Sequence, residues 1–96
     1  MTDDANSKMI NKLREIVAKK GNDLTVGDFL TPEIIWIIDC TPLKDDDRKF
    51  AYLRFVQRKK ASAILEEMGW YSPNTFTRHN KNVWNMLLRT VDRLLG

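Results

Sequence analysis

The side chains best suited to chemistry in this chain gather in residues 72–82, SPNTFTRHNKN. Amides, hydroxyls and positive charges dominate this stretch, and it contains no carboxylate. In a DNA major groove, Arg binds the O6 and N7 atoms of guanine and Asn binds adenine, and each such pair contributes about 1–3 kcal/mol of discrimination between bases. The residue types therefore favour recognition of nucleic acid. The candidate base contacts are Asn74, Thr75, Thr77, Arg78 and Asn82.

A second group of residues is suited to the phosphate backbone. Lys and Arg neutralise phosphates and position a protein without reading sequence. A hydroxyl or free backbone N–H groups at a helix N-terminus also bind phosphate. The candidate phosphate contacts are Arg58, Lys59, Lys60, Ser72 and Lys81. For each residue of both groups, the alternative is an ordinary solvated side chain on a helix or turn.

Other kinds of site are not indicated. Asp45, Asp46 and Asp47 are consecutive, but neighbours on a helix point in different directions, and no spaced His or carboxylate joins them. His79 is the only histidine, and we interpret it as a helix-surface residue near the DNA backbone. The sequence lacks the spacings typical of nucleophilic catalysis, phosphate loops or Cys/His metal sites. We expect no enzymatic activity, no metal and no cofactor.

Two helices and a tight turn are needed to position the candidate contacts. Gly69 can adopt the left-handed conformation that ends a helix. Ser72 then stands where an N-cap is expected, and Pro73 suits the first helical position. The sequence therefore predicts helices over about 61–68 and 73–95. A short turn between two helices, the second opening with polar and basic residues, is the layout of a helix-turn-helix.

The last predicted helix also carries an apolar stripe that is expected to form the core. Its far end, from Val91 onward, leaves a homodimer open as an alternative. Trp70 is interpreted as part of the core, although Trp70 and Tyr71 could instead stack on unpaired bases. The members of the stripe are Phe76, Val83, Trp84, Leu87, Leu88, Val91, Leu94 and Leu95.

Three further helices are predicted before residue 61. The first spans about 6–20, where apolar residues recur at helical spacing. The second spans 32–40, with Thr31 as its N-cap, although its five consecutive apolar residues also fit a buried strand or a subunit interface. The third begins at Asp45, where carboxylates meet unpaired N–H groups.

Composition places these elements in one all-α domain of four or five helices. The chain has 96 residues, 43% of them hydrophobic, and contains no apolar run long enough to span a membrane. Its only cysteine, Cys40, fits a reducing compartment, and we expect a cytoplasmic protein without a signal peptide. Residues 1–47 hold six Lys and Arg against ten Asp and Glu, whereas residues 48–96 hold ten against three. Two parts are therefore expected, an acidic part over 1–44 and a basic helix-turn-helix part over 45–96, whose positive charge attracts a polyanion.

The segment LRFVQRKKASAILEEMG (53–69), followed by YSPNTFTRHNKNVWNML, resembles region 4 of sigma-70-type factors. It is most similar to small phage and mobile-element regulators of the ArpU and RinA type. The resemblance covers about 40 residues: 53–55 match the end of a preceding helix, 64–69 a scaffold helix, and 72–76 the entry to a recognition helix. Arg58–Lys60 stand where that family usually has Gly or Ser. The resemblance implies a DNA-binding helix-turn-helix.

Together these observations predict sequence-specific binding of double-stranded DNA by a small phage or mobile-element transcriptional regulator, with RNA polymerase as a further partner to consider. The alternative is a protein–protein adaptor that docks a polymerase or replication protein through the apolar helix at 33–40 and the last helix. A weaker alternative is single-strand binding through Trp70 and Tyr71. Salt distinguishes the first two, because phosphate contacts weaken steeply with ionic strength and apolar docking does not.

Overall fold

A computed structural model describes residues 2–21 and 23–96, with side chains from Ser7 onward. Within these residues the fold is all-α, as the sequence predicted, and no strand occurs. The 3-10 helix η1 (Val26–Asp28) precedes α2, and the π-helical segment η2 (Tyr52–Val56) continues α3. The α-helices are α1 (Thr2–Lys20), α2 (Thr31–Cys40), α3 (Asp45–Ala51), α4 (Ala61–Met68) and α5 (Pro73–Leu95).

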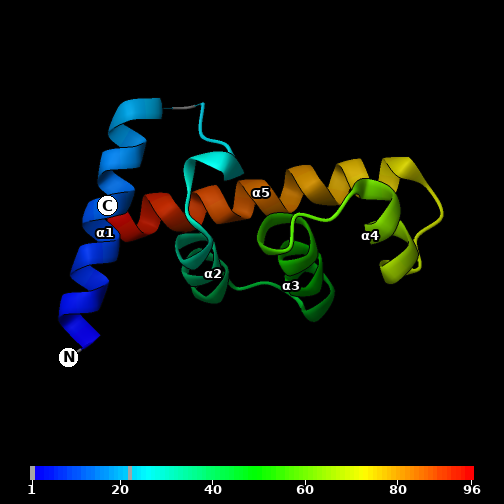
Figure 1. Ribbon diagram of the computed structural model, residues 1–96, viewed down its shortest axis with the longest axis horizontal. Helices are drawn as coiled ribbons and strands as arrows, with labels where there is room; N and C mark the ends of the chain where they lie inside the picture. Colours follow the sequence, from blue (N-terminus) through cyan, green and yellow to red (C-terminus); the bar gives the residue numbers. More distant parts are fainter. Residues whose placement is uncertain (1, 22) are drawn as a thin grey trace.

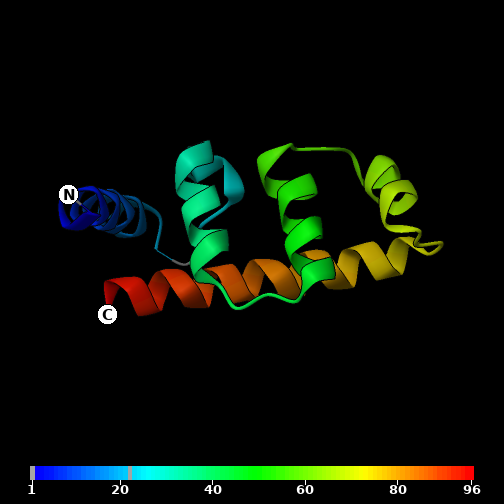
Figure 2. The same cartoon turned by 90° about the horizontal axis from the view of Figure 1, so that it is seen from below.

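Helix α5 is the axis of the molecule (Figure 1). Helices α2, α3 and α4 follow one another along its length, and Figure 2 shows α2 and α3 standing on the same side of it. Helix α1 crosses the C-terminal end of α5, whereas the turn between α4 and α5 lies at the opposite end. The molecule measures 43 × 28 × 19 Å. Helix α1 is therefore far from the candidate contacts in the first turns of α5.

Two helix starts differ from the sequence prediction. Helix α1 begins at Thr2 rather than near residue 6. Thr31 is not the N-cap of α2 but its first residue, because Leu30 holds the extended N-cap conformation. The Leu30 N–H donates to Glu33 Oε1 at 2.7 Å, so a carboxylate in the first turn satisfies this donor. In the sequence, Gly21, Asn22 and Asp23 also predict the end of this helix, and Asn22 lies outside the described residues.

The apolar run of α2 is helical and mostly core, which confirms the prediction of a helix over that of a buried strand. Ile34, Ile37 and Ile38 are at most 1% exposed, and Trp36 is partly buried against the core. Most of the apolar stripe predicted for α5 lies on the inner face of this helix, against the core. Its buried members are Phe76, Val83, Leu87 and Val91.

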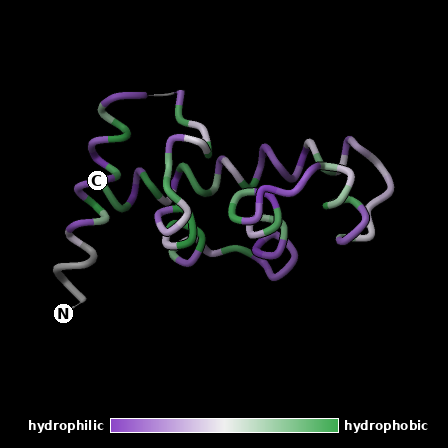
Figure 3. Tube along the Cα trace, in the orientation of Figure 1, coloured by the Kyte–Doolittle hydropathy of each residue, from purple (hydrophilic) through white to green (hydrophobic). Residues whose placement is uncertain are grey.

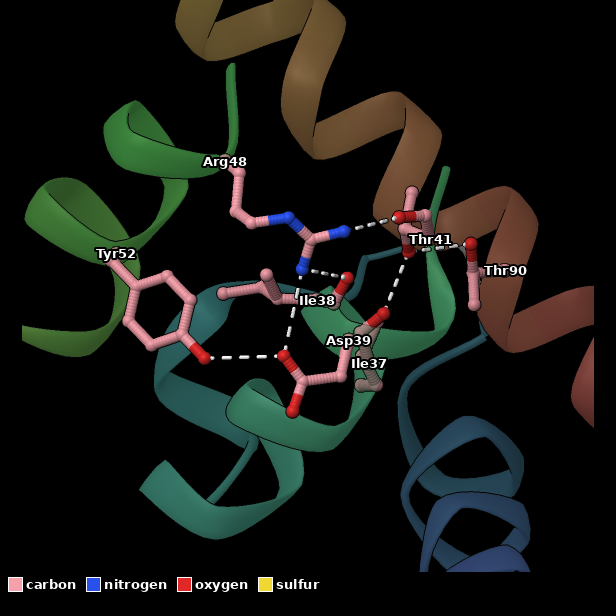
Figure 4. A network of polar contacts seen from close by, with 7 residues as sticks. All are labelled: Ile37, Ile38, Asp39, Thr41, Arg48, Tyr52 and Thr90. Carbon is pink, nitrogen blue, oxygen red and sulfur yellow. Dashed lines mark hydrogen bonds and ion pairs between the residues drawn. The ribbon is translucent and has the colours of Figure 1, made fainter. Parts of the chain in front are cut away.

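A polar network fixes α2 and α3 on α5 (Figure 4). The guanidinium of Arg48, on α3, donates to the carbonyls of Ile38 and Thr41 at 3.4 and 3.3 Å and lies 3.5 Å from the Asp39 carboxylate. The Thr41 hydroxyl, at the end of α2, meets Thr90 on α5. These bonds occupy the carbonyls that the end of a helix leaves free. They hold the two short helices against the long one.

Candidate nucleic-acid interface

The basic turn that leads into α4 has an unusual backbone. Arg58 has a φ of +57°, in the left-handed region that glycine occupies most easily. This conformation closes the end of η2, where the Gln57 N–H donates to the Tyr52 carbonyl and the Lys59 N–H to the Leu53 carbonyl. The turn therefore has a glycine-like geometry although its residue is arginine, and the Arg58 side chain is exposed.

The three basic residues of this turn are not equivalent. The side chains of Arg58 and Lys60 are exposed. The Lys59 ammonium forms an ion pair with Glu67 on α4 and is partly buried. Because Glu67 already balances its charge, Lys59 is the least available of the three for a phosphate. Figure 3 shows the hydrophilic character of this segment.

The turn between α4 and α5 forms as the sequence predicted. Gly69 has a φ of +71° and its N–H donates to the Glu66 carbonyl, while the Trp70 N–H donates to the Leu65 carbonyl. This pair of bonds is the Schellman motif, which satisfies the last carbonyls of α4. The Ser72 Oγ then accepts the N–H of Asn74 at 3.2 Å, which confirms Ser72 as the N-cap of α5.

The candidate base contacts lie mainly on the outer face of α5. The side chains of Asn74, Thr77, Arg78 and Asn82 are exposed, and Thr75 is partly buried. The Thr77 hydroxyl donates to the Pro73 carbonyl at 3.2 Å, so its single proton is engaged within the helix. Helical geometry brings these positions to one side of the first three turns, because residues three and four apart share a face.

The same face continues beyond the predicted residues. Lys81, a candidate phosphate contact, is exposed and lies between Asn80 and Asn82 in the sequence. Asn85 and Arg89 are also exposed and follow at the same spacing. Neither residue is among the candidate contacts predicted from the sequence, although counting by three and four from Lys81 and Asn82 leads to both. The outer face of α5 is defined below as Asn74, Thr77, Arg78, Lys81, Asn82, Asn85 and Arg89.

This outer face carries positive charge and no acidic residue from Asn74 to Arg89; the next exposed position at the same spacing is the acidic Asp92. The ion pairs of the described residues join Lys12 to Glu33, Lys20 to Asp28, Arg48 to Asp39, Lys59 to Glu67 and His79 to Asp47. Arg78 and Lys81 take part in none of these pairs. Their charges therefore face solvent, where a polyanion would meet them.

His79 is not the surface residue that the sequence suggested. It is partly buried, its ring stacks on Trp70 at 4.3 Å between centroids, and its Nδ1 lies 3.2 Å from Asp47 Oδ1. Trp70 also stacks on the buried Phe50, so it belongs to the core as predicted. His79 and Trp70 thus join α5 to α3 and to the turn. Tyr71, by contrast, is 99% exposed.

Within the described residues, no group of three or more His, Cys, Asp and Glu side chains could hold a metal ion. None of the described helices has the length and apolar character required to span a membrane. A comparison of the chain with known protein families, with curated proteins and with solved structures finds no match.

Proposed function

We propose that this protein binds double-stranded DNA in a sequence-specific manner, with α5 as the reading helix. The observation that carries the proposal is the outer face of α5, where exposed amide and cationic side chains occupy successive turns without a carboxylate. An α-helix with its side chains is about 10–12 Å across and fits the major groove, which is about 12 Å wide. Arg78 and Asn74 are the lead base contacts.

The surroundings of this face support the same proposal. Arg58 and Lys60 lie in the turn before α4, and Lys81 lies on α5 itself, all exposed and all suited to phosphates on either side of a groove. Helix α1 does not cover them, because it crosses the opposite end of α5. A role as a small phage or mobile-element transcriptional regulator rests on the resemblance to sigma-70 region 4 and belongs to the proposal as its finer part.

Fluorescence anisotropy tests the proposal. A labelled duplex of about 30 base pairs is titrated with protein between about 50 and 200 mM salt. We expect binding that weakens steeply over this range. We expect Arg78→Ala and Lys81→Ala to weaken binding further. Arg14→Ala and Lys8→Ala are matched controls, because they remove the same charges from exposed positions on α1, at the far end of the molecule. Equal losses in all four variants would mean that only net charge matters, and the outer face would not be the interface.

The adaptor alternative has less support. It would use the apolar side chains of α2 and of α5, and most of these are buried in the core: Ile34, Ile37, Ile38, Phe76, Val83, Leu87 and Val91. Among the described residues, the large apolar side chains classed as exposed are Leu30 and Tyr71, which lie on different loops. An affinity for polymerase or a replication protein that does not respond to salt, with no duplex binding at low salt, would favour the adaptor.

A further inference from the structure

A pocket of about 340 Å³ lies between the loop before α2, the end of η2 and the middle of α5. This volume is at the lower end of the range for small-molecule sites, about 300–1,000 Å³. The pocket is separate from the outer face of α5, because Asn80 and Trp84 are not members of that face. The residues that define its chemistry are Leu24, Val26, Arg54, Arg58, Asn80 and Trp84.

Two guanidinium groups give the pocket its charge. Arg54 is partly buried and held in place, since its Nη1 donates to the Lys59 carbonyl at 3.3 Å and its Cζ lies 5.3 Å from the centre of the Phe76 ring. A guanidinium has five donors, so this single bond leaves most of them free. Arg58, whose backbone is left-handed, also lines the pocket. No acidic residue lines the pocket, and neither arginine belongs to an ion pair of the described residues. Such a site favours an anion.

The opposite wall favours a flat ring. Trp84 is held edge-to-face by Phe29, with ring centroids 6.2 Å apart, and packs on Phe55 at 5.3 Å. Leu24 and Val26 add apolar surface beside it. Asn80 lines the same pocket, and its Oδ1 is buried without a hydrogen-bond partner among the described residues. A buried amide oxygen without a partner destabilises the protein, and a ligand whose ring N–H or amino group reached it would supply the missing hydrogen bond.

We propose that this pocket binds a nucleoside monophosphate, with the base against Trp84 and Asn80 and the phosphate on Arg54 and Arg58. A planar ring with hydrogen-bonding edges and an attached anion is the chemistry that these walls combine. Two sources supply it: a free nucleotide, or an unpaired nucleotide of a DNA strand. The inference goes beyond duplex binding by α5, because Arg54, Asn80 and Trp84 are not among the proposed duplex contacts. Arg58 is the one residue that both proposals use.

Proton–nitrogen correlation spectra of the full chain, titrated with AMP to about 10 mM, test the site. We expect shifts of the Asn80 side-chain amide, the Trp84 indole N–H and the backbone of residues 24–26. Adenosine and inorganic phosphate, each carrying half of the chemistry, should bind at least about tenfold more weakly. Arg58→Gly and Asn80→Leu should weaken AMP binding by about tenfold. Arg78→Ala should leave it unchanged.

Three results would overturn the proposal: no shifts at the highest AMP concentration, shifts confined to the outer face of α5, or phosphate alone binding as tightly as AMP. A duplex with one unpaired adenine distinguishes the sources. If this duplex displaces AMP and a fully paired duplex does not, the site binds unpaired nucleotides of DNA. If neither duplex displaces AMP, the site binds free nucleotides. Duplex binding is measured separately through Arg78→Ala, so failure of one proposal does not imply failure of the other.

Discussion

The side-chain hydroxyls of Thr41 and Thr90 lie 2.6 Å apart inside the core, although 49 positions separate the two residues in the chain. Thr41 Oγ1 also lies 2.6 Å from the Ile37 carbonyl oxygen, and Thr90 Oγ1 lies 3.2 Å from the Met86 carbonyl oxygen. Each hydroxyl has one proton to donate. Both protons form hydrogen bonds if the Thr41 hydroxyl donates to the Ile37 carbonyl and the Thr90 hydroxyl donates to the Thr41 hydroxyl oxygen. The end of α2 is thereby fixed to one position on α5.

Replacing each threonine by valine tests this arrangement, because valine keeps the shape and removes the hydroxyl. We expect Thr90→Val to lower the free energy of unfolding by about 1 kcal/mol through loss of one hydrogen bond. Thr41→Val should cost more, about 1–3 kcal/mol, since it also leaves the buried Thr90 hydroxyl with only a longer partner. Urea unfolding of both variants and the double variant measures the coupling. Strictly additive losses would show that the two hydroxyls do not interact.

Arg58→Gly should separate stability from binding. A non-glycine residue in the left-handed conformation costs about 1 kcal/mol, so glycine at this position is expected to raise the free energy of unfolding by up to that amount. The same change removes a candidate phosphate contact, so the slope of log affinity against log salt should fall by about one. Urea unfolding and anisotropy check the two effects. Lower stability would show that the Arg58 side chain contributes more to the fold than its backbone costs.

Arg78 and Lys81 should respond differently to a change of DNA sequence. Arg78 is proposed as a lead base contact. Arg78→Ala should therefore weaken binding to a selected site by about 1–3 kcal/mol and relax the sequence preference at one base position. Lys81→Ala should weaken binding to all sequences about equally, because a phosphate contact carries no base information. Selection from a random duplex library, followed by affinity measurements on single-base variants, distinguishes these roles. If both variants keep the specificity of the original chain, neither side chain reads a base.

Tyr52 should make stability depend on alkaline pH. Its hydroxyl donates to Asp39 Oδ1 at 3.2 Å, and burial, followed by the Asp39 carboxylate, raises the pKa of Tyr52 above its usual value. The folded chain therefore holds this proton more tightly than the unfolded chain does. The resulting stability is complete below the ordinary tyrosine pKa, near 10, and is lost as pH rises through the folded pKa.

Tyr52→Phe removes this dependence. The free energy of unfolding of the original chain should approach that of Tyr52→Phe as pH rises above about 10. Urea unfolding across this range measures the difference, and Tyr71→Phe, at an almost fully exposed position, serves as the control. A difference that stays constant with pH would show that the Tyr52 hydroxyl titrates alike in both states.

Local signals account for what could be predicted from the sequence. Gly69, Ser72 and Pro73 act on backbone groups within a few residues, so the end of α4 and the start of α5 could be placed correctly. Helical spacing then separated the buried Phe76 and Val83 from the exposed Arg78 and its neighbours. The exposure of Asn74, Thr77, Arg78, Lys81 and Asn82 follows from this periodicity. Their contact with DNA stays a prediction.

Features that depend on distant residues could not be predicted. His79 pairs with Asp47 across 32 positions, so a lone histidine gave no hint of its partner. The nucleotide pocket combines residues 24–26, 54–58 and 80–84, which share no motif. The π-helical geometry of Tyr52–Val56 also has no signal in its apolar pattern, which suits an α-helix equally well.

The outer face and much of the core belong to one uninterrupted helix, α5, whose 23 residues extend over about 34 Å. Such a helix can transmit motion by tilting as a rigid lever, without rearrangement of its own backbone. A tilt of about five degrees about the N-terminal end of α5 would move its other end, where α1 crosses it, by about 3 Å. A ligand that tilts α5 when it binds the outer face would thus change the distance between the C-terminal end of α5 and α1. The secondary structure between them would not change.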